Sequence, residues 1–123
     1  MEKIVIPKTK SSPEIIMDYK GGLLEIIGES YPENSLAFYK PVFEWIDKCI
    51  QDKIELKVNF KLNYFNTSSS KCVIDILDRL DKYFANSGIA SIKWYYEEDD
   101  DDMMETGEEF SSDLKVPFQL VYY

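Results

Sequence analysis

A cluster of hydroxyl groups in the segment 66–71, with sequence NTSSSK, offers the clearest chemistry in this chain. Four hydroxyl-bearing residues stand in a row there and a lysine follows them: Thr67, Ser68, Ser69, Ser70 and Lys71. At the start of a helix, a side-chain oxygen accepts hydrogen bonds from backbone amides that have no partner within the helix. The same free amides and the positive end of the helix dipole also attract anions such as phosphate.

The segment 66–71 therefore has three interpretations, and spacing alone does not choose among them. In the first, Asn66 or Thr67 caps a helix and nothing else happens there. In the second, the turn binds a free anion, which would explain why Lys71 falls in the first helical turn, where a cation opposes the helix dipole. In the third, a hydroxyl carries a covalent phosphate, which adds about −1.5 to −2 charges. The glycines of a P-loop are missing.

The elements on either side of this turn are predicted by hydrophobic periodicity. Residues 53–64 alternate apolar and polar side chains, which indicates a strand with one buried and one solvated face, the apolar face ending at Tyr64. After the turn, apolar residues recur at helical spacing up to Phe84. We expect one common core built from Leu56, Val58, Phe60, Leu62, Val73, Ile76, Leu77 and Leu80.

The rest of the chain predicts a two-layer α/β domain spanning residues 1–123. Extended runs at 3–6, 14–19 and 23–28 indicate an edge strand and a hairpin turning at Gly21-Gly22. A helix follows, begun by Asn34 or Ser35, with Pro41 in its first turn or at a kink. A strand at 89–96, a short helix at 103–110 and a strand at 117–123 complete a mixed sheet with helices mainly on one face.

Charge and composition exclude several functions. The net charge is −9, and nine acids with no base fall within residues 97–109, so DNA or RNA binding is not expected. The chain has no histidine, which removes the commonest general base and metal ligand and disfavours an enzyme. We expect Cys49 and Cys72 to be free core thiols. Without a signal peptide or an apolar run of about 20 residues, we expect a cytoplasmic protein with no membrane insertion.

The acidic run 97–102 has three interpretations of its own. It could be a solvated loop that caps the next helix, with Asp102 and Glu105 at the spacing of a capping box. It could dock on a basic partner through Asp99, Asp100, Asp101 and Asp102. A calcium site is disfavoured because the spacing and central glycine of an EF-hand are absent.

Several stretches of the chain resemble the SiaC family of regulatory phosphoproteins, over residues 7–121. The similar stretches are Ser12-Pro13-Glu14-Ile15, the run GESYPENS at 28–35, YFNTSSSK at 64–71, IKWYY at 92–96 and GEEF at 107–110. The combination of SYPENS with NTSS-x-K is specific, since neither is a common turn sequence.

The resemblance implies a fold of the STAS type, like that of anti-sigma-factor antagonists, and a partner switch. By this resemblance Thr67 is phosphorylated by a partner kinase, a PPM-type protein phosphatase removes the phosphate, and the unmodified protein activates a diguanylate cyclase that promotes biofilm formation. Asn66, Ser68, Ser69 and Lys71 would support the site. No catalytic residue, metal or cofactor is expected. An anion- or ligand-sensing domain that uses the 66–71 turn remains the alternative.

Overall fold

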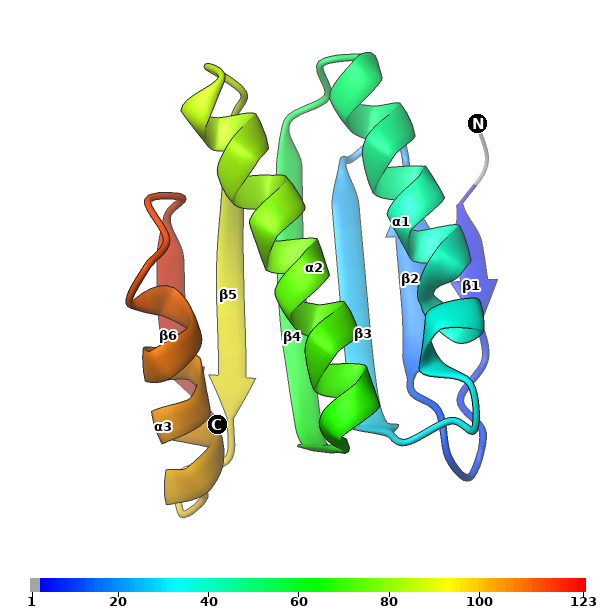
Figure 1. The fold of residues 1–123 in the computed structure, drawn as a ribbon, viewed down its shortest axis with the longest axis vertical. Helices are drawn as coiled ribbons and strands as arrows, with labels where there is room; N and C mark the ends of the chain where they lie inside the picture. The colour runs from blue at the N-terminus through cyan, green and yellow to red at the C-terminus, as the bar shows by residue number, and fades with distance from the viewer. Residues whose placement is uncertain (1–2) are drawn as a thin grey trace.

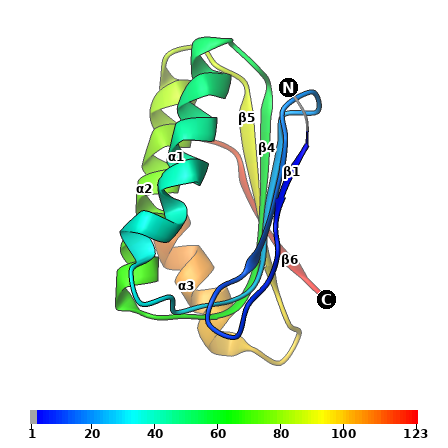
Figure 2. The ribbon, with the colours of Figure 1, turned by 90° about the vertical axis from the view of Figure 1, so that its right-hand side faces the viewer.

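The computed structural model describes residues 3–123 as one six-stranded sheet with three helices, all on the same side of the sheet (Figures 1 and 2). The strands are β1 (Ile4–Ile6), β2 (Glu14–Asp18), β3 (Leu23–Ser30), β4 (Leu56–Phe65), β5 (Ala90–Tyr96) and β6 (Phe118–Tyr122). The helices are α1 (Ser35–Gln51), α2 (Thr67–Ala85) and α3 (Asp101–Ser111). The predicted mixed α/β sheet with helices on one face is therefore confirmed.

The strands lie in the sheet in the same order as in the sequence, from β1 to β6. The pairs β1–β2 and β2–β3 are antiparallel, and the predicted hairpin turns at Gly22, whose φ of 62° favours glycine. The pairs β3–β4, β4–β5 and β5–β6 are parallel, with one helix in each connection. Consequently β3, β4 and β5 end at the same edge of the sheet, and α1, α2 and α3 all begin there (Figure 1).

The core lies between the helices and the sheet, and the predicted register of β4 and α2 is correct. All eight residues expected to be buried together are at most 2% exposed: Leu56, Val58, Phe60, Leu62, Val73, Ile76, Leu77 and Leu80. Cys49 and Cys72 are free and buried, as predicted. Burial raises the pKa of the Cys49 thiol to about 11. No helix among residues 3–123 is long and apolar enough to cross a bilayer.

The alternation of β4 changes at its carboxyl end, where the prediction for Tyr64 is wrong. The pairing of β3 with β4 shifts between Gly28 and Glu29, so that Asn63 is an extra residue on β4. Such a bulge turns the following side chains to the opposite faces of the sheet. Tyr64 is consequently 49% exposed, with its ring edge-on to Tyr31, and Phe65 packs against the core in its place.

Two details of the helix ends also differ from the prediction. Pro41 is the seventh residue of α1, so its predicted placement in the first turn is wrong, while Asn34, one of the two predicted caps, is the N-cap of the helix. Helix α3 is capped by Asp100, whose carboxylate accepts the Met103 N–H at 3.0 Å. The expected capping box of Asp102 and Glu105 is therefore wrong, because the helix starts two residues earlier.

Helix α3 packs closely against β5 at Gly107. A Cβ at this position would lie 2.5 Å from Cδ1 of Trp94 and 2.7 Å from Cδ2 of Leu120. The indole N–H of Trp94 donates a hydrogen bond to the carbonyl of Met103 at 3.0 Å. Gly107 is therefore required for close approach to a buried tryptophan, which explains the packing role of the GEEF stretch.

Candidate functional site

The segment 66–71 lies where β4 ends and α2 begins, at the edge of the sheet where all three helices start. Asn66 is the N-cap, and its side-chain oxygen accepts the backbone N–H of Ser69 at 2.9 Å and the hydroxyl of Ser68 at 3.2 Å. Of the two predicted caps, Asn66 is correct and Thr67 is not. The hydroxyls that follow are therefore not needed for capping.

The hydroxyls of the segment have different environments. Ser69 is fully buried, and Ser68 shares a hydrogen bond of 2.9 Å with Ser35. Ser70 is half-buried, and its backbone N–H donates to the carbonyl of Asn66. Thr67 is exposed, and its side chain makes no hydrogen bond within residues 3–123. Among these residues, Thr67 combines an exposed hydroxyl with freedom from internal hydrogen bonds.

Ser69 is the centre of a buried polar network that sequence reasoning did not predict. Its hydroxyl accepts from Ser30 at 2.8 Å and lies 3.2 Å from the hydroxyl of Ser35. Ser30 is also 2.7 Å from the phenol oxygen of Tyr39, whose pKa burial raises to about 12. Ser30 ends β3 and Ser35 begins α1, so the network joins the two stretches SYPENS and NTSS. The feature of the sequence that could have indicated this network is the pair of serines in SYPENS, Ser30 and Ser35.

The amino ends of α1 and α2 consequently lie side by side. Within the described residues, the backbone N–H groups of Ser35 and Leu36 on α1, and of Thr67 and Ser68 on α2, make no hydrogen bond. Such groups, with the two helix dipoles, produce a positive electrostatic potential. Lys71 is exposed and is the fifth residue of α2, so it lies one turn beyond Thr67 and not in the first turn as predicted.

The acidic residues 99–102 lie at the same edge of the sheet, after β5, the strand next to β4. Asp100 is the cap of α3, and Asp101 and Asp102 are in its first turn, where negative charge stabilises a helix. Asp99, Asp101 and Asp102 are exposed. Among residues 3–123, no cluster of carboxylates and thiols is arranged to hold a metal ion.

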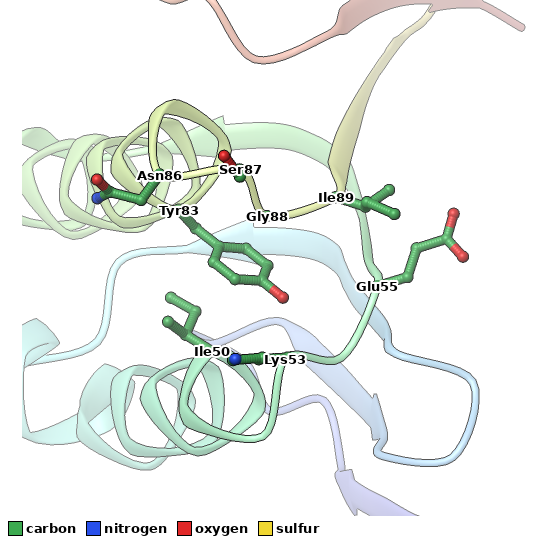
Figure 3. A pocket seen from close by; sticks show the side chains of 8 residues that line it. All are labelled: Ile50, Lys53, Glu55, Tyr83, Asn86, Ser87, Gly88 and Ile89. Carbon is green, nitrogen blue, oxygen red and sulfur yellow. The ribbon is translucent and has the colours of Figure 1, made fainter.

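A pocket of about 460 Å³ lies at the opposite end of the molecule, where α1 and α2 end. Figure 3 shows the Tyr83 ring lying between Ile50 and the Gly88-Ile89 segment, with the carboxylate of Glu55 directed away from it. The depression nearest the 66–71 turn is lined by Glu29 and Asn66 with two tyrosines. A carboxylate in its lining makes this depression itself unsuited to an anion.

Comparison with known proteins identifies the family of this chain. A family model described as SiaC family regulatory phosphoprotein matches residues 6–123. The chain belongs to the SiaC family. An uncharacterised protein from Pseudomonas aeruginosa strain UCBPP-PA14 is 36% identical over 121 residues, covering 98% of this chain and 96% of that protein. Membership makes the chain one of a family of bacterial signalling proteins, as the resemblance of its motifs implied.

Solved structures of SiaC from Pseudomonas aeruginosa share the fold. Apo-SiaC superposes with a TM-score of 0.91 at 36% identity, and the alignment covers 98% of this chain and 99% of that one. SiaC in complex with the diguanylate cyclase SiaD, which it activates, gives a TM-score of 0.94 at 35% identity with the same coverage. In that complex the SiaC relative is the regulatory partner and SiaD is the cyclase.

Proposed function

We propose that this protein is a phosphorylation-controlled partner switch and not itself an enzyme. In its unmodified form it binds and activates a diguanylate cyclase, as SiaC of Pseudomonas aeruginosa does with SiaD. A partner kinase phosphorylates Thr67, which ends this binding, and a PPM-type protein phosphatase restores it. Asn66, Ser68 and Ser69 hold the turn in shape through their hydrogen bonds, and Lys71 counters the charge of the phosphate.

The observation that carries this proposal is that Thr67, among the four hydroxyl residues 67–70, is both exposed and without a side-chain hydrogen bond within residues 3–123. A kinase must reach a hydroxyl and remove it from any existing hydrogen bond. Ser69 is buried, and Ser68 is bonded to Ser35 and Asn66, whereas Thr67 has neither restraint within residues 3–123. Thr67 is therefore the hydroxyl of this pair of motifs that is available without rearranging the core.

The fold can hold the phosphate once it has formed. On Thr67 the phosphate group lies beside the free amides of α2 and near those of α1, which form charge-assisted hydrogen bonds with anions. Lys71 follows four residues later on the same face of α2, and helical side chains lean toward the amino end. We therefore expect phosphorylation to leave the fold intact and to stabilise it by about 0.3–1 kcal/mol.

The effect of the phosphate falls on binding. An interface that fits a neutral threonine has no partner for a dianion, which must then be desolvated without compensation. A penalty of about 3 kcal/mol or more follows, which is roughly a hundredfold or greater loss of affinity. The kinase, in contrast, engages the unmodified form and releases the product.

The test is reconstitution with the cognate kinase, phosphatase and cyclase. Incubation with kinase and ATP followed by mass spectrometry should place the phosphate on Thr67, and titration should show cyclase activation only by the unmodified protein. The variant Thr67→Ala should remain folded, resist modification and activate constitutively, while Thr67→Asp should imitate the inactive form incompletely. Ser68→Ala is the matched control, and it should still be modified. Phosphate on Ser68 or Ser69, or normal switching by Thr67→Ala, would refute the assignment.

The acidic run is proposed as a second contact with a partner, because it lies at the same edge as Thr67. Exposed charges at the rim of an interface mainly govern the rate of encounter, and salt screens them. Replacing Asp99, Asp101 and Asp102 with asparagine leaves the Asp100 cap in place. Compared with the unaltered protein, this variant should associate more slowly with a partner that docks through a basic surface, and its association should depend less on salt. Association that does not respond to salt in the unaltered protein argues against this role.

A further inference from the structure

The face of the sheet that no helix covers divides into an acidic and a basic half. The outward side chains of β2 and β3 include the acids Glu14, Asp18, Glu25 and Glu29 and, among their strand positions, no base. The outward side chains of β4 and β5 include the bases Lys57, Lys61 and Lys93 and, among their strand positions, no acid. The boundary between the halves runs between β3 and β4, at the middle of the six strands.

Among residues 3–123, no ion pair involves these charged side chains. The ion pairs in residues 3–123 lie on α1, its C-cap Asp52 and α2, at Lys48–Asp52, Arg79–Asp47 and Arg79–Asp75. On the uncovered face, Glu25 accepts a hydrogen bond from the amide of Asn59, and Lys61 lies 4.3 Å from the centre of the Tyr123 ring. Half-buried apolar side chains surround the charges, among them Ile16, Ile27, Tyr95 and Val121.

We propose that this face is the contact surface of a symmetric dimer of this chain. A two-fold axis that runs parallel to the strands, between β3 and β4, places the acidic half of each copy on the basic half of the other. An axis perpendicular to the strands would instead place acid on acid and base on base, which is unfavourable. The charge division therefore selects one arrangement, with β3 of one copy over β4 of the other and β2 over β5.

The net charge does not prevent this dimer, because it is concentrated in residues 97–109. With the proposed axis, strand β6 of one copy and strand β6 of the other lie on opposite sides of the dimer. They are more than 20 Å apart for strands spaced about 4.8 Å. Their acidic segments are thus separated by more than the Debye length of about 8 Å at physiological salt. Repulsion between them is screened, while the opposed halves of the two faces are in contact.

The area of the face sets the strength of association. Six strands about 4.8 Å apart, with about five residues of 3.3 Å each, present roughly 450 Å² per copy. A standard stable interface buries about 800 Å² per partner, so this dimer is weak and depends on concentration.

Because the axis is parallel to the strands, both copies present the Thr67 edge at the same end. A two-fold symmetric partner would therefore meet two such edges at once, which raises avidity.

Sedimentation equilibrium of the purified protein at about 0.15 M salt, where the Debye length is about 8 Å, tests the proposal. The average mass should rise with concentration from the 14.4 kDa of the monomer toward twice that value. The double variant Lys61→Glu/Lys93→Glu leaves Lys57 as the one base at the outward strand positions of the basic half, which becomes net negative. The double variant Glu14→Lys/Glu25→Lys leaves Asp18 and Glu29 beside two lysines, so that the acidic half loses its net charge. Each alone should dimerise at least about tenfold more weakly, and an equimolar mixture of the two should recover a heterodimer.

The matched control is Lys40→Glu/Lys82→Glu, which makes the same charge change on exposed lysines of α1 and α2. It should dimerise like the unaltered protein, and thermal melting should show that every variant is folded. A monomer of the unaltered protein at millimolar concentration would overturn the proposal and leave the face for another partner. Variants that dimerise unchanged, or that fail to associate when mixed, would also overturn it.

Discussion

The variant Ser69→Ala tests whether the buried serine network stabilises the junction between α1 and α2. Ser69 is fully buried and its hydroxyl contacts Ser30 at 2.8 Å and Ser35 at 3.2 Å. Removing it leaves both partners one hydrogen bond short, although Ser30 retains Tyr39 and Ser35 retains Ser68. A buried polar group left without a hydrogen-bond partner costs about 1–3 kcal/mol. Because Ser30 and Ser35 each keep one other hydrogen bond, we expect the free energy of unfolding to fall by about 1–2 kcal/mol.

This loss can be converted into a melting temperature. With an unfolding entropy of about 2.1 cal/mol/K per residue, a chain of this length has about 0.25 kcal/mol/K in total, so 1–2 kcal/mol lowers the midpoint by roughly 4–8 °C. Circular dichroism during heating measures the shift. Thr67→Ala is the control, and it should change stability by less than about 0.5 kcal/mol because its hydroxyl is exposed. A Ser69→Ala midpoint within 1 °C of the unaltered protein, or equal to that of Thr67→Ala, would refute the reasoning.

Three further predictions concern a cap, a close contact and a buried phenol. Asn66→Ala should lower the free energy of unfolding by about 1 kcal/mol in urea titrations, because the Ser69 N–H loses its acceptor, whereas Asn66→Asp should retain most of it; equal losses would contradict the capping role. Gly107→Ala should cost about 1–3 kcal/mol because its Cβ would meet the Trp94 ring, while Gly21→Ala, with 3.4 Å to the nearest atom, should be nearly neutral in the same titrations. Burial raises the pKa of Tyr39 to about 12, so the folded form keeps a proton that the unfolded chain loses near pH 10. The contribution of the protonated Tyr39 phenol to the free energy of unfolding is complete below about pH 10 and is lost as pH rises through 12. The free energy of unfolding of Tyr39→Phe should therefore decline less steeply over this pH range. An identical decline would show that another group is responsible.

The sequence by itself determined the layers of this protein. The alternation from Leu56 to Leu62 and the helical spacing from Val73 to Leu80 each bury one face, and burying an apolar face requires a second layer, whatever its neighbours are. Local chemistry also predicted the hairpin at Gly21-Gly22 and a helix cap at Asn66 or Thr67, because φ preferences and free amides depend on residues close in sequence. The family, too, followed from short motifs.

The tertiary structure alone decided which hydroxyls are free. Parallel pairing of β3 with β4 places Ser30 and Ser35 against Ser68 and Ser69, which are more than thirty residues away, and this contact commits two hydroxyls of the NTSS stretch while Thr67 stays exposed. A bulge where the pairing of these strands shifts turned Tyr64 outward against the prediction. Both outcomes depend on the register between distant strands, and register is set by packing across the sheet, which no local pattern encodes.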